Sequence, residues 1–283
     1  MNLEGAMKQA RQNRRVWSAA RWCAYFVRQR RTLLAVPWDR GPELTEKERC
    51  LVGPSLQEFQ QGEGLEGRHF FRCVAAYGER TGERDYVEAH RLFMAEEKRY
   101  ARDLARFLRM AGIPLLERQS RLNHAFCWLG SRGGLETTLA IIVMVEVIAQ
   151  TYYAALKGAT GSAVLCRLCD QILRDEKSHV RFQAERLAIL RRGRPGLLLR
   201  LTQAFDFFFF VGAGLACWWG HRRVLRAGGL GFVRFWRAAE ERLRAAWGQK
   251  DPRRYDWDAP APSIGIAFRS APRLYSAVVR TRA

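Results

Sequence analysis

The chain has 283 residues, 48% of them hydrophobic, and a formal net charge of +20 with a pI near 10.5. That hydrophobic content is enough for one well-filled core with extensions, and the sequence contains no Ser/Gly-rich linker or internal repeat that would favour two equal domains. The positive charge is almost all arginine and is spread along the chain, so it suits nucleic acid, anionic lipid, an acidic partner or an ordinary solvated surface.

The first predicted element is a basic amphipathic helix within residues 6–31, which carries Trp17, Trp22 and Phe26 on its apolar side. The same arginine-rich stretch lacks the uninterrupted apolar region of a cleavable signal peptide. A loop with turn residues throughout, VPWDRGPELTEKER, is predicted after it.

Four long helices are predicted next, because apolar residues recur with helical spacing and almost no segment alternates with the period of a strand. The expected ranges are 55–80, 85–110, 135–157 and 162–192. The polar segment 113–133 is expected to be irregular and leaves room for a connection that crosses the bundle. Two helical hairpins joined in this way form one version of the four-helix bundle.

About two more helices and an irregular tail from Asp251 are predicted at the C-terminal end. Segment 204–223 is apolar apart from Asp206, is short for a membrane span and ends in a basic run, which favours a buried or interfacial helix. The predicted parts are a basic N-terminal helix and loop (1–54), the four-helix domain (55–192) and an aromatic and basic extension (193–283).

Glu146 is the only charged residue between Leu139 and Ala149, in a helix that is otherwise apolar on every side. Burial of an isolated carboxylate costs several kcal/mol unless the group is paired, protonated or bound to a metal. A buried arginine or lysine, or a helix that is half exposed, would be the structural alternatives to a metal ligand.

The fourth predicted helix contains RDEKSHVRF, in which Glu176 and His179 are three residues apart and share one helix face. A lone ExxH motif is weak, because it occurs by chance in many helices. Glu146 and Glu176, however, are equidistant from Gly161 in the predicted turn GATGS, so an antiparallel hairpin brings them to one level.

Glu66 and Glu97 mirror each other in the same way about the predicted turn TGERD. Two hairpins therefore direct carboxylates to one level of the predicted bundle. Several carboxylates in a low-dielectric interior repel one another, and two divalent cations would neutralise four of them. The predicted cluster is Glu66, Glu97, Glu146, Glu176 and His179.

This pattern resembles the ferritin-like di-iron carboxylate superfamily, which takes Glu, ExxH, Glu and ExxH from four successive helices. The resemblance covers about residues 55–192, and RDEKSHVRFQ is similar to the motif of rubrerythrin-like members. It implies an all-α, ferritin-like four-helix bundle with an extra N-terminal helix and about two C-terminal helices. It also implies a cofactor of two iron ions, with manganese as the alternative.

The helix-two motif AEEKRYARDL departs from the family, because Tyr100 stands where the family has histidine. The phenolate can bind ferric iron, or the side chain only fills the space. His69 is then the alternative nitrogen ligand, and Glu63 is the alternative to Glu66 on the first helix. The implied metal-binding set is Glu66, His69, Glu97, Tyr100, Glu146, Glu176 and His179.

Glu96 and Asp175 each precede a metal-binding glutamate, at the position where the family has an acid that orients a metal-bound histidine. Salt bridges to surface arginines are the alternative for both. His90 is expected on the helix surface, and neither His124 nor His221 has a partner at ligand spacing.

The implied function is a non-haem oxidoreductase that activates dioxygen or peroxide and depends on an external electron donor. Ile142, Val145 and Ala149 would form the apolar wall that holds an organic substrate. The alternative is a non-catalytic, degenerate bundle that binds a membrane or a partner. The basic and aromatic ends suit a peripheral membrane surface or another anionic partner, while a nucleic-acid partner has no motif to support it.

The seven cysteines are odd in number and scattered, which indicates reduced thiols rather than a disulfide framework. We therefore expect a cytoplasmic protein, either free or peripheral at the inner face of the membrane. Cys166 and Cys169 form the single CxxC motif. No second such motif exists in the sequence, so small packing residues are the better interpretation than a zinc site.

Overall fold

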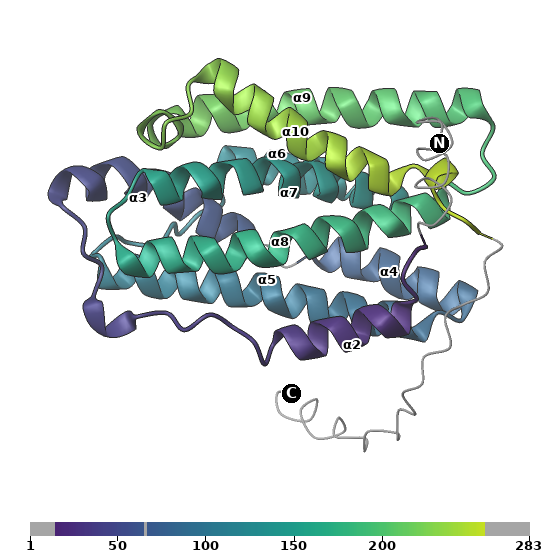
Figure 1. Cartoon of the computed structure of the whole chain (residues 1–283), viewed down its shortest axis with the longest axis horizontal. Helices are drawn as coiled ribbons and strands as arrows, with labels where there is room; N and C mark the ends of the chain where they lie inside the picture. Colours follow the sequence, from purple (N-terminus) through teal and green to yellow (C-terminus); the bar gives the residue numbers. More distant parts are fainter. Residues whose placement is uncertain (1–14, 65–66, 258–283) are drawn as a thin grey trace, which may run out of the picture.

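The computed structural model describes residues 15–64 and 67–257 (Figure 1). The regular elements in these ranges are all helical, without a strand, which confirms the all-α class. The helices are α2 (Ala19–Gln29), α3 (Glu46–Glu63), α4 (Arg68–Thr81), α5 (Arg84–Met110), α6 (Arg121–Gly130), α7 (Leu135–Gly158), α8 (Ala163–Leu190), α9 (Gly196–Ala227) and α10 (Phe232–Lys250). Two short 3-10 helices, η1 (Trp38–Arg40) and η2 (Pro252–Arg254), accompany them.

The N-terminal helix α2 packs its apolar side against the rest of the protein. It begins after Ser18, whose side chain accepts a hydrogen bond from the Arg21 amide, so the described helix is shorter than the predicted range 6–31. Trp22 and Phe26 are buried, and both rings contact Phe182 of α8, at centroid distances of 5.2 and 5.3 Å. These aromatic side chains therefore serve internal packing.

Helix α3 begins earlier than predicted, at Glu46 instead of Ser55, and crosses the predicted boundary between residues 54 and 55. A capping box explains the early start: Thr45 and Glu48 each bond the other's backbone amide. The predicted loop therefore supplies the first turns of a helix.

The predicted helix 55–80 was also wrong in its middle, because α3 ends at Glu63 and α4 begins at Arg68. Gly67 lies between them with φ of +43°, a left-handed conformation that interrupts the helix. A Cβ at Gly67 would lie 2.7 Å from Met94 Cε, so the position also has no room for a side chain. Helical periodicity consequently does not carry through this segment.

The helices predicted at 85–110, 135–157 and 162–192 are α5, α7 and α8, within a residue or two at each end. They lie side by side, with α7 against α8 and α8 against α5 (Figure 1). The predicted irregular segment 113–133 contains α6, a correction explained by Ser120, whose hydroxyl caps the new helix at the Asn123 amide.

Helices α9 and α10 are the two predicted C-terminal helices, and they cover α7 and α8 on the side away from α2 (Figure 1). A buried ion cluster fastens them. Asp206 of α9 accepts hydrogen bonds from Arg191, at the end of α8, and from Lys250, the last residue of α10, at 2.8 and 2.6 Å. Helix α9 thus has one face fixed to the body of the protein.

Candidate metal centre

Glu146 lies in the middle of α7 with its side chain buried. Neither carboxylate oxygen has a hydrogen-bond partner among the described residues. Among the same residues, the charged groups that shift the pKa of Glu146 are His179 and other glutamates, and none is an arginine or lysine. Within the described part of the chain, Glu146 therefore has neither a buried basic partner nor an exposed position. These were the two structural alternatives to a metal ligand.

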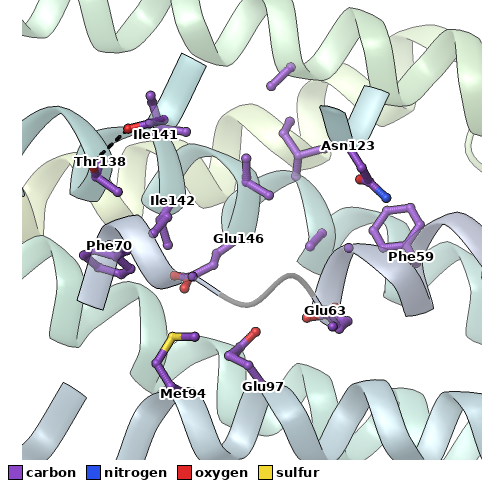
Figure 2. A pocket seen from close by; sticks show the side chains of 18 of the residues that line it. Phe59, Glu63, Phe70, Met94, Glu97, Asn123, Thr138, Ile141, Ile142 and Glu146 are labelled. Atoms are coloured by element: carbon purple, nitrogen blue, oxygen red, sulfur yellow. Dashed lines mark hydrogen bonds between the residues drawn. The ribbon is translucent and has the colours of Figure 1, made fainter. Parts of the chain in front are cut away.

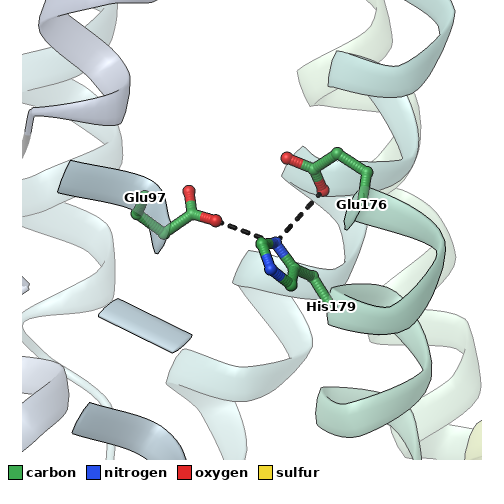
Figure 3. Close-up of side chains that lie close together, drawn as sticks. All are labelled: Glu97, Glu176 and His179. Atoms are coloured by element: carbon green, nitrogen blue, oxygen red, sulfur yellow. Dashed lines mark ion pairs between the residues drawn. The ribbon is translucent and has the colours of Figure 1, made fainter. Parts of the chain in front are cut away.

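Glu97 of α5 and Glu176 and His179 of α8 converge on one another (Figure 3), and all three interact electrostatically with Glu146. Their ligand atoms lie within 4.8 Å of one another. His179 Nδ1 is 2.8 Å from Glu97 Oε1 and 4.0 Å from Glu176 Oε2.

The short contact between His179 Nδ1 and Glu97 Oε1 lacks the geometry of a hydrogen bond, and neither atom has such a partner among the described residues. Neighbouring ligands of one ion, with bonds near 2.1 Å, lie about 3 Å apart. Two possible ligand atoms that approach this closely without hydrogen-bond geometry are spaced as a cation between them would require.

Glu96 orients the imidazole. Its Oε2 lies 2.9 Å from His179 Nε2, and because a carboxylate accepts, we assign the proton to Nε2. Nδ1 then faces Glu97 and Glu176. Burial lowers the pKa of His179, but the Glu96 hydrogen bond and the negative charges of Glu97 and Glu176 outweigh it and hold the pKa well above 6.5, so a cation at Nδ1 would replace a proton there. Glu96 thus occupies the orienting role expected from the sequence.

Glu63, at the end of α3, supplies a further carboxylate. Figure 2 shows Glu63, Glu97 and Glu146 around one cavity, which Glu176 also lines. The Tyr153 hydroxyl of α7 donates a hydrogen bond of 2.7 Å to Glu63 Oε1. Of the two glutamates considered for the first helix, Glu63 reaches the cavity, whereas Glu66 lies outside the described residues.

The carboxylates raise one another's pKa. Burial is the largest cause for Glu63, Glu146 and Glu176, and the neighbouring carboxylates add to it, so that each pKa stands well above 4.5. Such groups keep their protons to a higher pH than ordinary carboxyl groups unless a cation replaces the protons. The donor set of carboxylate oxygens with one imidazole nitrogen suits iron or manganese.

Tyr100 is buried beside the cluster, and its hydroxyl donates to Asp175 Oδ2 over 2.9 Å. Burial, followed by the charge of Asp175, raises its pKa well above 10, which favours the neutral phenol. Asp175 also accepts hydrogen bonds from Arg99 and Gln171. The structure therefore places Tyr100 as a hydrogen-bond donor next to the converging ligands.

His69 lines the same cavity but is turned away from the cluster. Its Nε2 lies 2.8 Å from the carbonyl oxygen of Gly133, in the connection before α7. The structure accordingly brings together Glu97, Glu146, Glu176 and His179, adds Glu63, and leaves His69 and Tyr100 bonded elsewhere.

The cavity has a volume of about 700 Å³ and extends from these carboxylates to the inner face of α9. Ile142, Val145 and Ala149 line it, as the sequence predicted. Cys217 and His221 of α9 also line it. A mainly apolar chamber thus adjoins the cluster.

Sequence reasoning missed Tyr153, although it lies two helical turns after Glu146 on the same face of α7, a spacing that signals proximity. It also misplaced His90, which is fully buried against Phe70, with 4.2 Å between ring centroids. Cys169 of the CxxC motif is buried and Cys166 half-buried, both as thiols, in keeping with packing residues.

The chain matches no protein-family model, no curated protein and no solved structure. The resemblance to ferritin-like proteins therefore rests on the motif residues of the sequence and stays a prediction.

Proposed function

We propose that this chain is a ferritin-like four-helix protein that binds two iron or two manganese ions and acts as a non-haem oxidoreductase. The four helices of the bundle would be α3 with α4, then α5, α7 and α8. The observation that carries the proposal is the approach of His179 Nδ1 to Glu97 and Glu176 beside Glu146, whose buried oxygens have no hydrogen-bond partner among the described residues.

Charge balance supports two ions rather than one. Glu63, Glu97, Glu146 and Glu176 carry four negative charges when deprotonated, and two divalent cations offset them. Glu97, Glu176 and His179 would hold one ion. Glu63 and Glu146 would hold the other, together with Glu97, whose charge acts on both of them.

The protein's own residues would prepare the site. Glu96 holds the proton at His179 Nε2 and so keeps Nδ1 available, and Tyr153 fixes the Glu63 carboxylate. When bound, a pair of iron or manganese ions supplies one-electron chemistry with dioxygen or peroxide. The apolar wall of the cavity favours an organic substrate with little polar surface and excludes bulk water from the cluster.

Metal analysis tests the proposal. The purified chain, reconstituted anaerobically with ferrous iron or manganese and desalted, is expected to hold about two ions per chain. Glu146→Gln and Glu176→Gln should each lose at least one ion with unchanged helical content by circular dichroism. Glu185→Gln is the matched control, a buried glutamate of α8 that bonds Trp22 outside the cluster, and it should retain both ions.

A non-catalytic bundle is the second candidate, favoured by one observation. Tyr100, at the position of the family's histidine, is bonded to Asp175, so the cluster contains a single imidazole. A wild-type chain that retains no ion after reconstitution would contradict the oxidoreductase and support a scaffold. Retention of both ions in Glu146→Gln and Glu176→Gln would remove the proposed site altogether.

A further inference from the structure

The outer face of α9 carries a row of exposed apolar side chains, here called the α9 stripe. Its large members are Leu197, Leu201, Phe205, Phe208, Leu215 and Trp219. They are 38–73% exposed, and their spacing of three, four or, past Gly212, seven residues puts them on one side of the helix. From Leu197 to Trp219 the row is about 33 Å long. An exposed apolar surface of this length marks a binding surface.

Basic groups accompany the stripe, and no exposed acid on α9 opposes them. Arg223 and Arg226 are exposed and continue the same helical spacing beyond Trp219. Arg222 lies beside them, with its guanidinium over the Trp219 ring at 5.4 Å. The single acid of α9, Asp206, points inward and is ion-paired. The combination of apolar, aromatic and cationic groups complements an anionic lipid surface.

The orientation of α9 determines how it would meet a bilayer. The helix is long and apolar enough to span a membrane by length and mean hydropathy. The same is true of α7, however, which is a core helix whose apolar stretch is 83% buried. The inner face of α9 packs against α7 and α3 and holds the ion cluster of Asp206. To span a membrane, α9 would have to break these contacts. It therefore suits a position parallel to the membrane surface.

A second copy of the chain fits the stripe less well. If two α9 helices met antiparallel along their full length across a two-fold axis, Arg200 of one copy would lie opposite Arg223 of the other, because each is four residues from an end of α9. If they met parallel, each arginine would face its own copy. Both arrangements bring like charges together, with no exposed acid on α9 to offset them.

We infer that the α9 stripe binds the surface of an anionic phospholipid bilayer, with α9 lying in the plane of the headgroups. Phe208 and Trp219 enter the acyl boundary and the arginines contact lipid phosphates. Because this inference rests on α9 alone, it holds or fails independently of metal binding.

Vesicle flotation with the full chain tests the inference. We expect binding to vesicles of phosphatidylcholine with phosphatidylglycerol, weaker binding to phosphatidylcholine alone, and a decrease as salt is added. The variant Leu201→Ser/Phe208→Ser/Trp219→Ser should reduce the partition coefficient about tenfold or more, because apolar area no longer leaves water. The control Val27→Ser/Leu33→Ser removes exposed apolar side chains in α2 and just after it, and should bind like the wild type, because α2 lies on the side of the protein opposite α9 (Figure 1).

A second pair of variants distinguishes vesicle binding by the α9 surface from vesicle binding by the net charge of the protein. Both triple variants remove three exposed arginines: Arg222→Gln/Arg223→Gln/Arg226→Gln on α9 and Arg28→Gln/Arg30→Gln/Arg31→Gln at the end of α2. The α9 variant is expected to weaken binding about tenfold or more, and the α2 variant to leave it near the wild-type value.

Three results would overturn the inference. The first is equal affinity for anionic and neutral vesicles, or no binding to either. The second is equal loss of binding in the α9 and α2 arginine variants, which would assign binding to net charge. The third is a dimer in sedimentation velocity that the stripe variant dissociates, together with no vesicle binding, which would assign the stripe to a second copy.

Discussion

Tyr100 and Asp175 are joined by a hydrogen bond of 2.9 Å from the phenol to Oδ2, beside the carboxylate cluster. At the position where the ferritin-like pattern has a histidine, this chain has a hydroxyl that donates its proton to an acid on α8. The raised pKa of Tyr100, caused first by burial, keeps that phenol protonated.

Ferric protein reconstituted from the wild-type chain is expected to lack the visible charge-transfer band of an iron phenolate, because the Tyr100 oxygen is bonded to Asp175. Tyr100→Phe should leave the absorption spectrum and metal content unchanged. The variant should lower the free energy of unfolding by about 1 kcal/mol, since Asp175 loses a buried donor. A purple or blue band that disappears in Tyr100→Phe would show instead that the phenolate is a ligand.

Glu96 is expected to control metal affinity through His179. Glu96→Leu removes the acceptor at Nε2, so the imidazole is no longer held with Nδ1 toward the cluster, and affinity should fall about 10–100-fold. Glu96→Gln keeps an acceptor oxygen and should lose less. Competition with a chromophoric chelator measures both. The control Glu88→Leu lies on the exposed side of α5 and should match the wild type, and equal affinities in all variants would contradict the role of Glu96.

Metal should reverse the pH dependence of stability. In chains depleted of metal, the raised pKa values of Glu63, Glu146 and Glu176 mean that the folded state retains protons that the unfolded state releases above about pH 4.5. Stability therefore falls as pH rises through the folded pKa values. Metal binding needs the deprotonated groups, so stabilisation by added Mn²⁺ should grow with pH and release protons.

Thermal unfolding between pH 6.5 and 9, with and without Mn²⁺, measures this dependence. Glu146→Gln replaces a buried acid by a neutral group of similar shape. It should flatten the decline of the melting temperature in metal-depleted protein and reduce the gain from Mn²⁺. A wild-type chain whose metal-depleted stability rises over this interval would contradict the arrangement of carboxylates described above.

His90 is expected to destabilise the protein in acid. Burial lowers its pKa to about 3, below 6.5 for the unfolded chain, and its ring nitrogens have no hydrogen-bond partner among the described residues. The folded state therefore binds fewer protons between these values. Its contribution to stability is complete above about pH 6.5 and falls as pH drops toward 3.

Urea unfolding at pH 7 and pH 5 measures the effect of His90. His90→Leu should lose less stability between these two values than the wild type, by about 2 kcal/mol. Because the stability of each variant at pH 7 is compared with its own stability at pH 5, the effect of the substitution on packing cancels. The exposed His124 offers the control, since His124→Gln should keep the wild-type difference. An unchanged difference in His90→Leu would show that His90 is accessible to water.

Periodicity and register in the sequence determined the helices α5, α7 and α8 and the common level of Glu97, Glu146, Glu176 and His179. The physical reason is that these helices are continuous, so counting residues from a short turn gives the level of each side chain. That these residues bind metal stays a prediction. The same counting failed at α3 and α4, because the left-handed Gly67 interrupts the helix, and Glu63 reaches the cavity instead.

Only the tertiary structure decided which apolar surfaces are covered. In the sequence, α2 and α9 both carry aromatic residues beside arginines, and both were candidates for a membrane surface. In the structure, Trp22 and Phe26 are buried against Phe182, while Phe208 and Trp219 face solvent. Hydrophobic spacing shows that a helix has an apolar face, but the neighbour that removes this face from water comes from distant parts of the chain.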